Sequence, residues 1–312
     1  MKLIRPATIT DTGLTSNVAE TDSPAWSASK SGGYAKGDRV LDAHHVWEWL
    51  SATAGNTTVA PSADTSTPAK WLDTGASNRW KMFDKKAGNK WLIGTSTANT
   101  ETIDVTIKAG EVVNSIGLFG LVASTVQVIM TDPADGEVYN KTIPLADTGV
   151  SNWYDYFFKP LDRTEIAVKF DLPAYGTASV RIIVTNPGAM AEVGLLVIGQ
   201  MIEIGTTVYG TGLGIQSYST TTEDDFGNVT VVSRGSRRLV DYDVRIPTEN
   251  VSSAFRTLTR LKDTPCVYVG YEGMEATITV GRFENLSENI ANPAFCEMSL
   301  EVRSLARWPS PS

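Results

Sequence analysis

Apolar residues recur at every second position in several stretches of the chain, which is the period of a half-buried β-strand. Nearly continuous apolar runs lie between these stretches and are typical of strands buried on both faces. Turn sequences such as Asp132-Pro-Ala-Asp-Gly136 and Asn186-Pro-Gly188 separate the segments. Before residue 200 the alternating segments are 103–107 and 166–172, and the apolar runs are 116–122, 126–130, 180–184 and 193–198. Residues 78–200 are therefore predicted to form an antiparallel β-sandwich.

The last part of the chain combines strands with one helix. Residues 240–246 and 296–302 alternate as strands do, and the polar run 223–228 predicts a hairpin turn. Apolar residues recur with helical spacing over 251–261, where Thr248 can cap the start and Pro265 follows the end. Residues 201–312 are therefore predicted to be an α+β domain. In a symmetric assembly, its helix would be expected to contact other subunits through Val251, Phe255, Leu258 and Leu261.

Residues 24–77 contain short strands and many tryptophans but too little apolar sequence for a large core. Within 46–50 the strand period places Trp47 and Trp49 on one face. Aromatic rings can lie flat against the C–H faces of sugars, so this small β module could bind carbohydrate. A module of this size also needs large side chains to fold, so the same rings could be its core. The candidate sugar contacts are Trp26, Tyr34, Trp47, Trp49 and Trp71.

Two further segments connect these parts. Residues 1–23 are predicted to be a polar N-terminal arm that cannot fold alone and either docks on a partner or pairs with a later strand. Residues 71–84 join the small module to the sandwich. Only 73–77 is expected to be free connection, so that the joint holds the two modules at a fixed angle.

Length and charge limit the class of protein. A chain of 312 residues is expected to form two or three domains. Its formal net charge of -8 argues against nucleic-acid binding, which needs clustered Lys and Arg. The densest basic group, Arg234, Arg237 and Arg238, is more typical of a solvated strand face or of subunit contacts than of a phosphate site. No apolar run is long enough for a signal peptide or a membrane span, so we expect cytoplasmic synthesis without a signal peptide.

Residue patterns typical of catalysis are sparse. The two histidines, His44 and His45, are neighbours, so a strand would point them to opposite faces; we expect both to be exposed and not to share a metal ion. Cys266 and Cys296 lie in apolar runs, which favours buried thiols over the disulfide that adjacent strands would still allow. No nucleophile elbow, metalloprotease helix or phosphate loop occurs in the sequence. The sequence therefore predicts a protein without catalytic activity, metal or cofactor.

Several segments resemble known families. Residues 24–50 carry Ala-Trp at 25–26, Tyr34, Gly-Asp-Arg-Val at 37–40 and Val-Trp-Glu at 46–48, and they resemble small chitin- and cellulose-binding modules. The run Asn-Arg-Trp-Lys-Met-Phe-Asp at 78–84, together with 153–158, is similar to galactose-binding-like jelly-roll domains. The order of the whole chain resembles tail proteins of double-stranded DNA bacteriophages, which carry the Trp-Leu-Asp-x-Gly-x-x-Asn-Arg-Trp-Lys-Met-Phe-Asp run found here at 71–84. Residues 205–312 resemble a tail-tip ring domain.

These resemblances imply a structural protein of a phage tail tip or baseplate, located in the virion tail. The expected partners are further copies of the chain in a ring, and the tube, hub and fibre proteins of the tail. Host-surface polysaccharide is a further expected partner, contacted by the projecting β modules. The alternative is a glycan-binding protein that attaches to a host or substrate through its carbohydrate-binding module.

Overall fold

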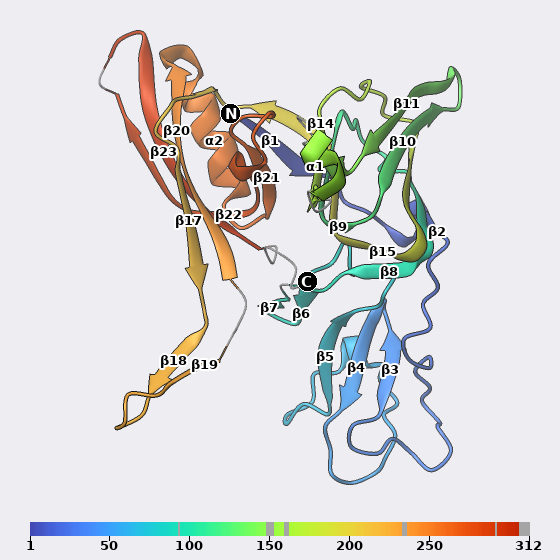
Figure 1. Ribbon diagram of the computed structural model, residues 1–312. Coiled ribbons are helices and arrows are strands. Elements are labelled where there is room, and N and C mark those ends of the chain that lie inside the picture. The colour runs from blue at the N-terminus through green and yellow to red at the C-terminus, as the bar shows by residue number, and fades with distance from the viewer. Residues whose placement is uncertain (93, 148–152, 159–161, 233–235, 291, 306–312) are drawn as a thin grey trace.

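The computed structural model describes residues 1–92, 94–147, 153–158, 162–232, 236–290 and 292–305. The fold is mainly β, with antiparallel pairing in all of its named strand ladders, as the sequence pattern predicts. Figure 1 shows a small β module at the bottom, a β-sandwich at the upper right and a sheet with one long helix at the upper left. The predicted fold class is therefore confirmed.

The sandwich is built around one long strand, β15 (Ser179–Glu203). Its first half pairs with β8 (Thr97–Ile107) and β10 (Thr125–Asp132), and its second half pairs with β9 (Ser115–Val122). The strand bends where its register against β8 shifts between Thr185 and Met190. The turn predicted at 186–188 is therefore wrong: the segment, with Gly188 at φ 73°, lies inside β15 and lets one strand contribute to both layers.

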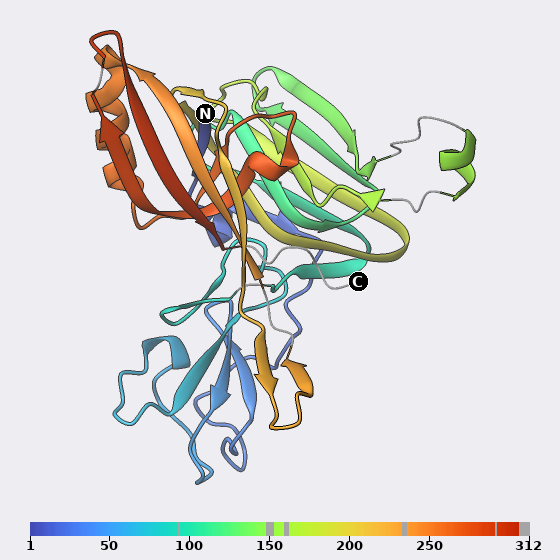
Figure 2. The same ribbon diagram turned by 60° about the vertical axis from the view of Figure 1, so that its left-hand side comes forward.

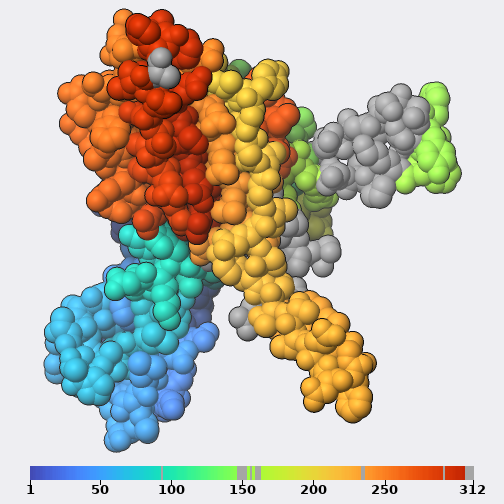
Figure 3. Space-filling model, turned by 90° about the vertical axis from the view of Figure 1, so that its left-hand side faces the viewer, coloured from blue at the N-terminus to red at the C-terminus, as the bar shows by residue number. Residues whose placement is uncertain are grey.

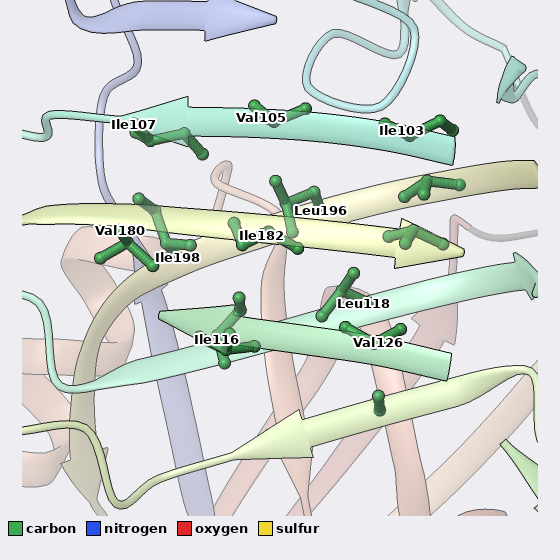
Figure 4. Packing of buried hydrophobic residues seen from close by; sticks show 14 of the residues in the cluster. Ile103, Val105, Ile107, Ile116, Leu118, Val126, Val180, Ile182, Leu196 and Ile198 are labelled. Carbon is green, nitrogen blue, oxygen red and sulfur yellow. The ribbon is translucent and has the colours of Figure 1, made fainter. Parts of the chain in front are cut away.

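The outer strands of the sandwich are shorter. β11 (Gly136–Pro144) pairs with β10, and β14 (Ile166–Lys169) pairs with β9. Between the layers, side chains of β8, β9, β10 and both halves of β15 point toward one another, as Figure 4 shows. Ile107, Ile116 and Leu118 have no exposed surface, which explains the apolar runs in the sequence.

The N-terminal segment is part of the largest sheet. β1 (Lys2–Pro6) lies between β15 and β21 (Cys266–Val269) and is antiparallel to both. Leu3 packs into the C-terminal core, whereas Ile4 packs into a cluster shared with the sandwich strands. β2 (Leu14–Ser16) then pairs with β8. Of the two fates expected for this segment, pairing with later strands is the one observed.

The C-terminal part contains β20 (Ser236–Pro247), β22 (Ile278–Asn289) and β23 (Phe295–Ser304), with β16 (Thr206–Thr207) and β17 (Gly212–Ser217) paired to β20. Helix α2 (Val251–Leu261) packs against this sheet, so the predicted helix is confirmed. Thr248 is not its cap, because residues Thr248–Asn250 form a 3-10 turn and no side chain caps the helix. Cys266 and Cys296 are buried free thiols, as expected, and burial raises the pKa of Cys266 to about 12.

The small module is a three-stranded sheet of β3 (Arg39–Asp42), β4 (His45–Trp49) and β5 (Trp71–Ala76). Short strands β6 (Lys86–Ala87) and β7 (Lys90–Trp91) follow it. Because β5 extends to Ala76, residues 73–76 are strand, and the free connection predicted at 73–77 is wrong.

Two elements protrude from the body of the molecule. β18 (Thr220–Glu223) and β19 (Val229–Val232) form a hairpin beyond the paired ends of β17 and β20, and Figures 1 and 2 show it extending away from the sheet. We call residues 218–232 the hairpin arm. On another side, the short helix α1 (Trp153–Phe158), which the sequence did not predict, stands out from the sandwich near β12 (Ala146–Asp147) and β13 (Asp162–Arg163). Figure 3 shows both protrusions in space-filling form.

Candidate functional site

Three of the five candidate sugar-binding rings form the core of the small module. Tyr34, Trp49 and Trp71 are 2%, 3% and 5% exposed. The ring centroids lie 4.9 Å apart for Trp49 and Trp71, and 5.0 Å apart for Tyr34 and Trp71, both in edge-to-face arrangement. Edge-packed, buried rings give no flat platform for a sugar. The expectation that these three rings bind sugar is therefore corrected: they are the core that the module's size requires.

The other two candidates, Trp26 and Trp47, reach the surface. Both are partly buried and pack against the aromatic core of the module. The indole nitrogen of Trp47 donates a hydrogen bond to the backbone oxygen of Asp42 at 3.2 Å, which fixes the ring near the β3–β4 turn. Any carbohydrate contact by this module therefore depends on Trp26 and Trp47.

Both histidines of the chain contact the joint (residues 71–84) between the small module and the sandwich. The imidazole of His45 lies between two carboxylates, with Nδ1 at 2.9 Å from Asp73 and Nε2 at 3.3 Å from Asp84. Hydrogen bonds to Asp84 and Asp73 favour the charged imidazolium and raise the pKa of His45 to about 9. His44 lies in the turn before β4, where Nδ1 is 3.1 Å from Glu20. The expectation that both histidines are exposed is wrong, because the side chains of His44 and His45 are only 34% and 19% exposed, respectively, and contact carboxylates.

Further hydrogen bonds hold the residues that follow β5. Ser77 is fully buried, and its hydroxyl donates to Glu20 at 2.5 Å. The Arg79 Nε donates to the backbone oxygen of Val18 at 2.8 Å. Asn78 exchanges two hydrogen bonds with the backbone of Ala98, at 2.7 and 3.0 Å. The joint is thus tied to the N-terminal segment and to β8, and it is a packed connection.

A cavity of about 600 Å³ lies beside the joint, where the sandwich, the N-terminal segment and the C-terminal part meet. Its wall includes the aromatic rings of Trp80, Phe83, Trp91 and Phe119. Lys85 also lines it and is 9% exposed, with its amine donating to the backbone oxygen and hydroxyl of Thr95. Burial lowers the pKa of Lys85 to about 7, so this amine changes charge near neutral pH.

The hairpin arm exposes apolar side chains on all of its faces. All eight residues of β18 and β19 are exposed. At the tip, Phe226 is 90% exposed in an otherwise polar turn. The other large apolar side chains exposed on the arm and on adjoining β17 are Leu213, Ile215, Tyr218, Val229, Val231 and Val232. The sequence predicted the turn at 223–228 correctly, but the significance of Phe226 was missed; an aromatic residue inside an acidic turn was the available signal.

The helix expected to contact other subunits is mostly used within the chain. Val251, Leu258 and Leu261 are 9%, 0% and 8% exposed and pack into the C-terminal core. Phe255 differs, since its side chain is 48% exposed. The expected assembly role of the three buried residues is therefore corrected. Only Phe255 of the four could reach a partner.

Two members of the basic group, Arg237 and Arg238, lie in β20 near the base of the hairpin arm. The guanidinium of Arg237 lies 5.5 Å from the ring centre of Tyr218. Arg238 donates to the backbone oxygen of Glu275 at 3.1 Å. Arg234 lies outside the described residues. The two described arginines thus contact their own chain.

Within the described residues, no three His, Cys, Asp or Glu side chains meet in a geometry that could hold a metal ion. None of the helices in the described ranges is long and apolar enough to cross a membrane. Comparisons with protein-family models, curated proteins and solved structures gave no match, so function has to be inferred from the geometry described above.

Proposed function

We propose that this protein is a structural subunit of a phage tail tip or baseplate, which assembles with its own copies into a ring and contacts tube, hub and fibre proteins of the tail. The observation that carries the proposal is the hairpin arm, because its apolar side chains are exposed and lie outside the cores that the described residues form. Assembled structural proteins bury such surfaces against partners.

The hairpin arm should also be only marginally stable without a partner. A two-stranded hairpin is marginally stable in water, and unpaired strand edges with apolar side chains invite pairing with another chain. Val229, Val231 and Val232 are 59%, 61% and 49% exposed. Contact with a partner would remove these side chains from water and stabilise the hairpin.

The packed joint supports a projecting role for the small module. Hydrogen bonds from Ser77 and Arg79 to the N-terminal segment, together with the His45–Asp84 contact, fix the direction in which the module leaves the sandwich. A component that presents a module outward from a particle needs such a fixed direction.

Replacing residues 218–235 by Asn-Gly tests the proposal. Ser217 and Ser236 are paired neighbours, so a two-residue hairpin turn closes the gap without altering β17 or β20. The mass of the purified protein in solution should fall from a ring to a monomer, with an unchanged circular dichroism spectrum. Ile290→Ser, which removes another exposed apolar side chain (71% exposed) outside the arm, is the matched control and should still assemble. A wild-type chain that stays monomeric and is absent from purified virions would refute the proposal.

The alternative function, glycan binding, is favoured by the surface position of Trp26 and Trp47 against the aromatic core. Trp26→Ala and Trp47→Ala should remove binding on an array of bacterial surface glycans while the module stays folded. Trp49→Ala should instead unfold the module, because that ring is buried. Unchanged glycan binding by both surface variants would exclude this function for the module.

A further inference from the structure

We propose that Phe226 at the tip of the hairpin arm inserts into a pocket at the far end of β20 in a second copy of the chain. The inference rests on the proposed assembly function and names the surfaces that meet. One surface is a rigid aromatic tip, and the other is a hollow beside Arg245 and Phe295.

The tip is held in one conformation by its own hydrogen bonds. The Asp224 carboxylate accepts from the backbone N–H groups of Phe226 at 3.0 Å and of Asn228 at 2.8 Å, and from the Asn228 side chain at 2.8 Å. Gly227 adopts φ 80°, which favours glycine and lets the turn close. The Phe226 ring is thus presented to solvent by a preformed turn, so little ordering is needed when it binds.

The pocket has a volume of about 430 Å³, which is ample for a phenyl ring. The guanidinium of Arg245 lies 4.1 Å from the ring centre of Phe295, which gives the pocket an aromatic wall with a positive edge. The remaining wall is made largely of Val208, Tyr209, Pro247 and Ala294. The aromatic wall suits an apolar ring, and the positive edge suits acidic groups next to that ring.

Charge complementarity favours a second copy as the partner. Glu223, Asp224 and Asp225 directly precede Phe226 at the tip, whereas Arg245 lies at the pocket with a side chain that is 48% exposed. Arg245 already contacts Glu297 at 3.4 Å, but that pair is exposed and therefore weak. The acidic tip of another chain could compete for the same guanidinium.

The positions of the two surfaces prevent a chain from filling its own pocket. The arm leaves the sheet at Ser236, and the pocket lies at Arg245 and Pro247, near the other end of the same strand. At about 3.3 Å per residue, the two ends of this 12-residue strand are roughly 40 Å apart. A tip-to-pocket contact is therefore heterologous, and such contacts produce a ring when the rotation between subunits closes.

Two single variants and their mixture test the contact. Phe226→Asp removes the aromatic tip, and Ala294→Glu fills the pocket with a charge that repels it; both positions are exposed, so the fold should persist. Each variant alone should be monomeric by native mass spectrometry, with self-association at least about tenfold weaker than wild type. Their equimolar mixture should form a one-to-one dimer that grows no further, because each dimer has one intact contact.

Charge reversal gives an independent measure. Asp225→Lys should weaken assembly, and combining it with Arg245→Glu in the same chain should restore it. Assembly of the Phe226→Asp chain as readily as wild type, or a mixture that stays monomeric, would overturn the inference while leaving the assembly function standing. A wild-type chain that never self-associates would refute the assembly function itself, so the two failures are distinguishable.

Discussion

At the scale of single residues, His45 joins the small module to the segment that follows it. Its imidazole contacts Asp73 in β5 and Asp84 beyond the module. The charge on this one ring therefore stabilises both the contact between β4 and β5 and the contact between the module and the segment after it. The side chain is 19% exposed, which leaves the pair only partly screened by water. A neutral ring would keep one hydrogen bond as donor and lose the attraction to both carboxylates.

The stability of the protein should therefore depend on pH through His45. Its pKa of about 9 in the folded state lies above the ordinary value of 6.5, so the stabilisation is fully present below pH 6.5 and is lost as pH rises through 9. His45→Gln should lower the free energy of unfolding by roughly 1–2 kcal/mol at pH 6 and by little at pH 10, measured by urea titration.

Asp84→Ala provides the matched variant for this residue. Without that carboxylate the pKa of His45 should fall, and NMR titration can follow it because the chain has two histidines. A pKa near 6.5 for the His45 imidazole in the wild-type protein would contradict the assigned contacts.

The candidate site could be predicted only in part, because residue type does not determine burial. The strand period places Trp47 and Trp49 on the same side of β4, and both do pack on the aromatic core of the module. Which of the rings is enclosed depends on Trp71 and Tyr34, which arrive from distant parts of the sequence. For the same reason an aromatic residue inside an acidic turn is only a partial signal for Phe226, whose exposure follows from the position of the arm away from the sheet (Figure 1).

At the scale of elements, the predictable parts are those with a local signal. Helix α2 has its own apolar period, β20 alternates from Val240 onward, and β23 alternates along its whole length. The partners of β1 are separated from it by about 200 residues or more of sequence, so no local pattern specifies them. The sequence predicts a turn at the bend in β15 because Asn, Pro and Gly have the same local preference in a turn and in a bulge.

The pairing of β1 with β15 depends on a glycine. A Cβ atom added to Gly199 would lie 1.8 Å from the backbone oxygen of Arg5, so Gly199→Ala must displace β1. We expect this variant to lose about 1–3 kcal/mol of stability, as overpacking does, and to lose hydrogen-exchange protection in β1 and β21.

Gly214→Ala is the control for this substitution. Its Cβ would meet Leu239 at an ordinary contact distance of 3.5 Å in another strand pair. Its stability should change by less than about 0.5 kcal/mol. Equal stability of the two variants would show that β1 approaches β15 less closely than the structure indicates.

At the scale of the whole molecule, two kinds of contact hold the parts together: strand pairing in the largest sheet and polar contacts at the joint. β1 gives the sandwich and the C-terminal part a shared set of strands, with Ile4 and Val267 buried in the cluster between them. The small module has its own aromatic core and is attached through polar contacts at the joint. The orientation of the module should therefore be the property most sensitive to charge substitutions.

Removing the carboxylates that cross the joint should release the small module. Glu20 contacts Ser77 and His44, and Asp84 contacts His45, so Glu20→Ala with Asp84→Ala removes the hydrogen bond of each histidine to a segment flanking the module and leaves His44 with the longer contact to Asp11, at 3.6 Å. In NMR relaxation the wild-type module should tumble with the body of the protein, whereas in the double variant it should tumble faster, because the tryptophan core keeps it folded. Glu48→Gln is the control, since Glu48 pairs with Arg39 inside the module at 3.0 Å and should leave tumbling unchanged. Identical tumbling of the double variant and the wild type would mean that apolar packing around Trp80, not the carboxylates, sets the angle of the module.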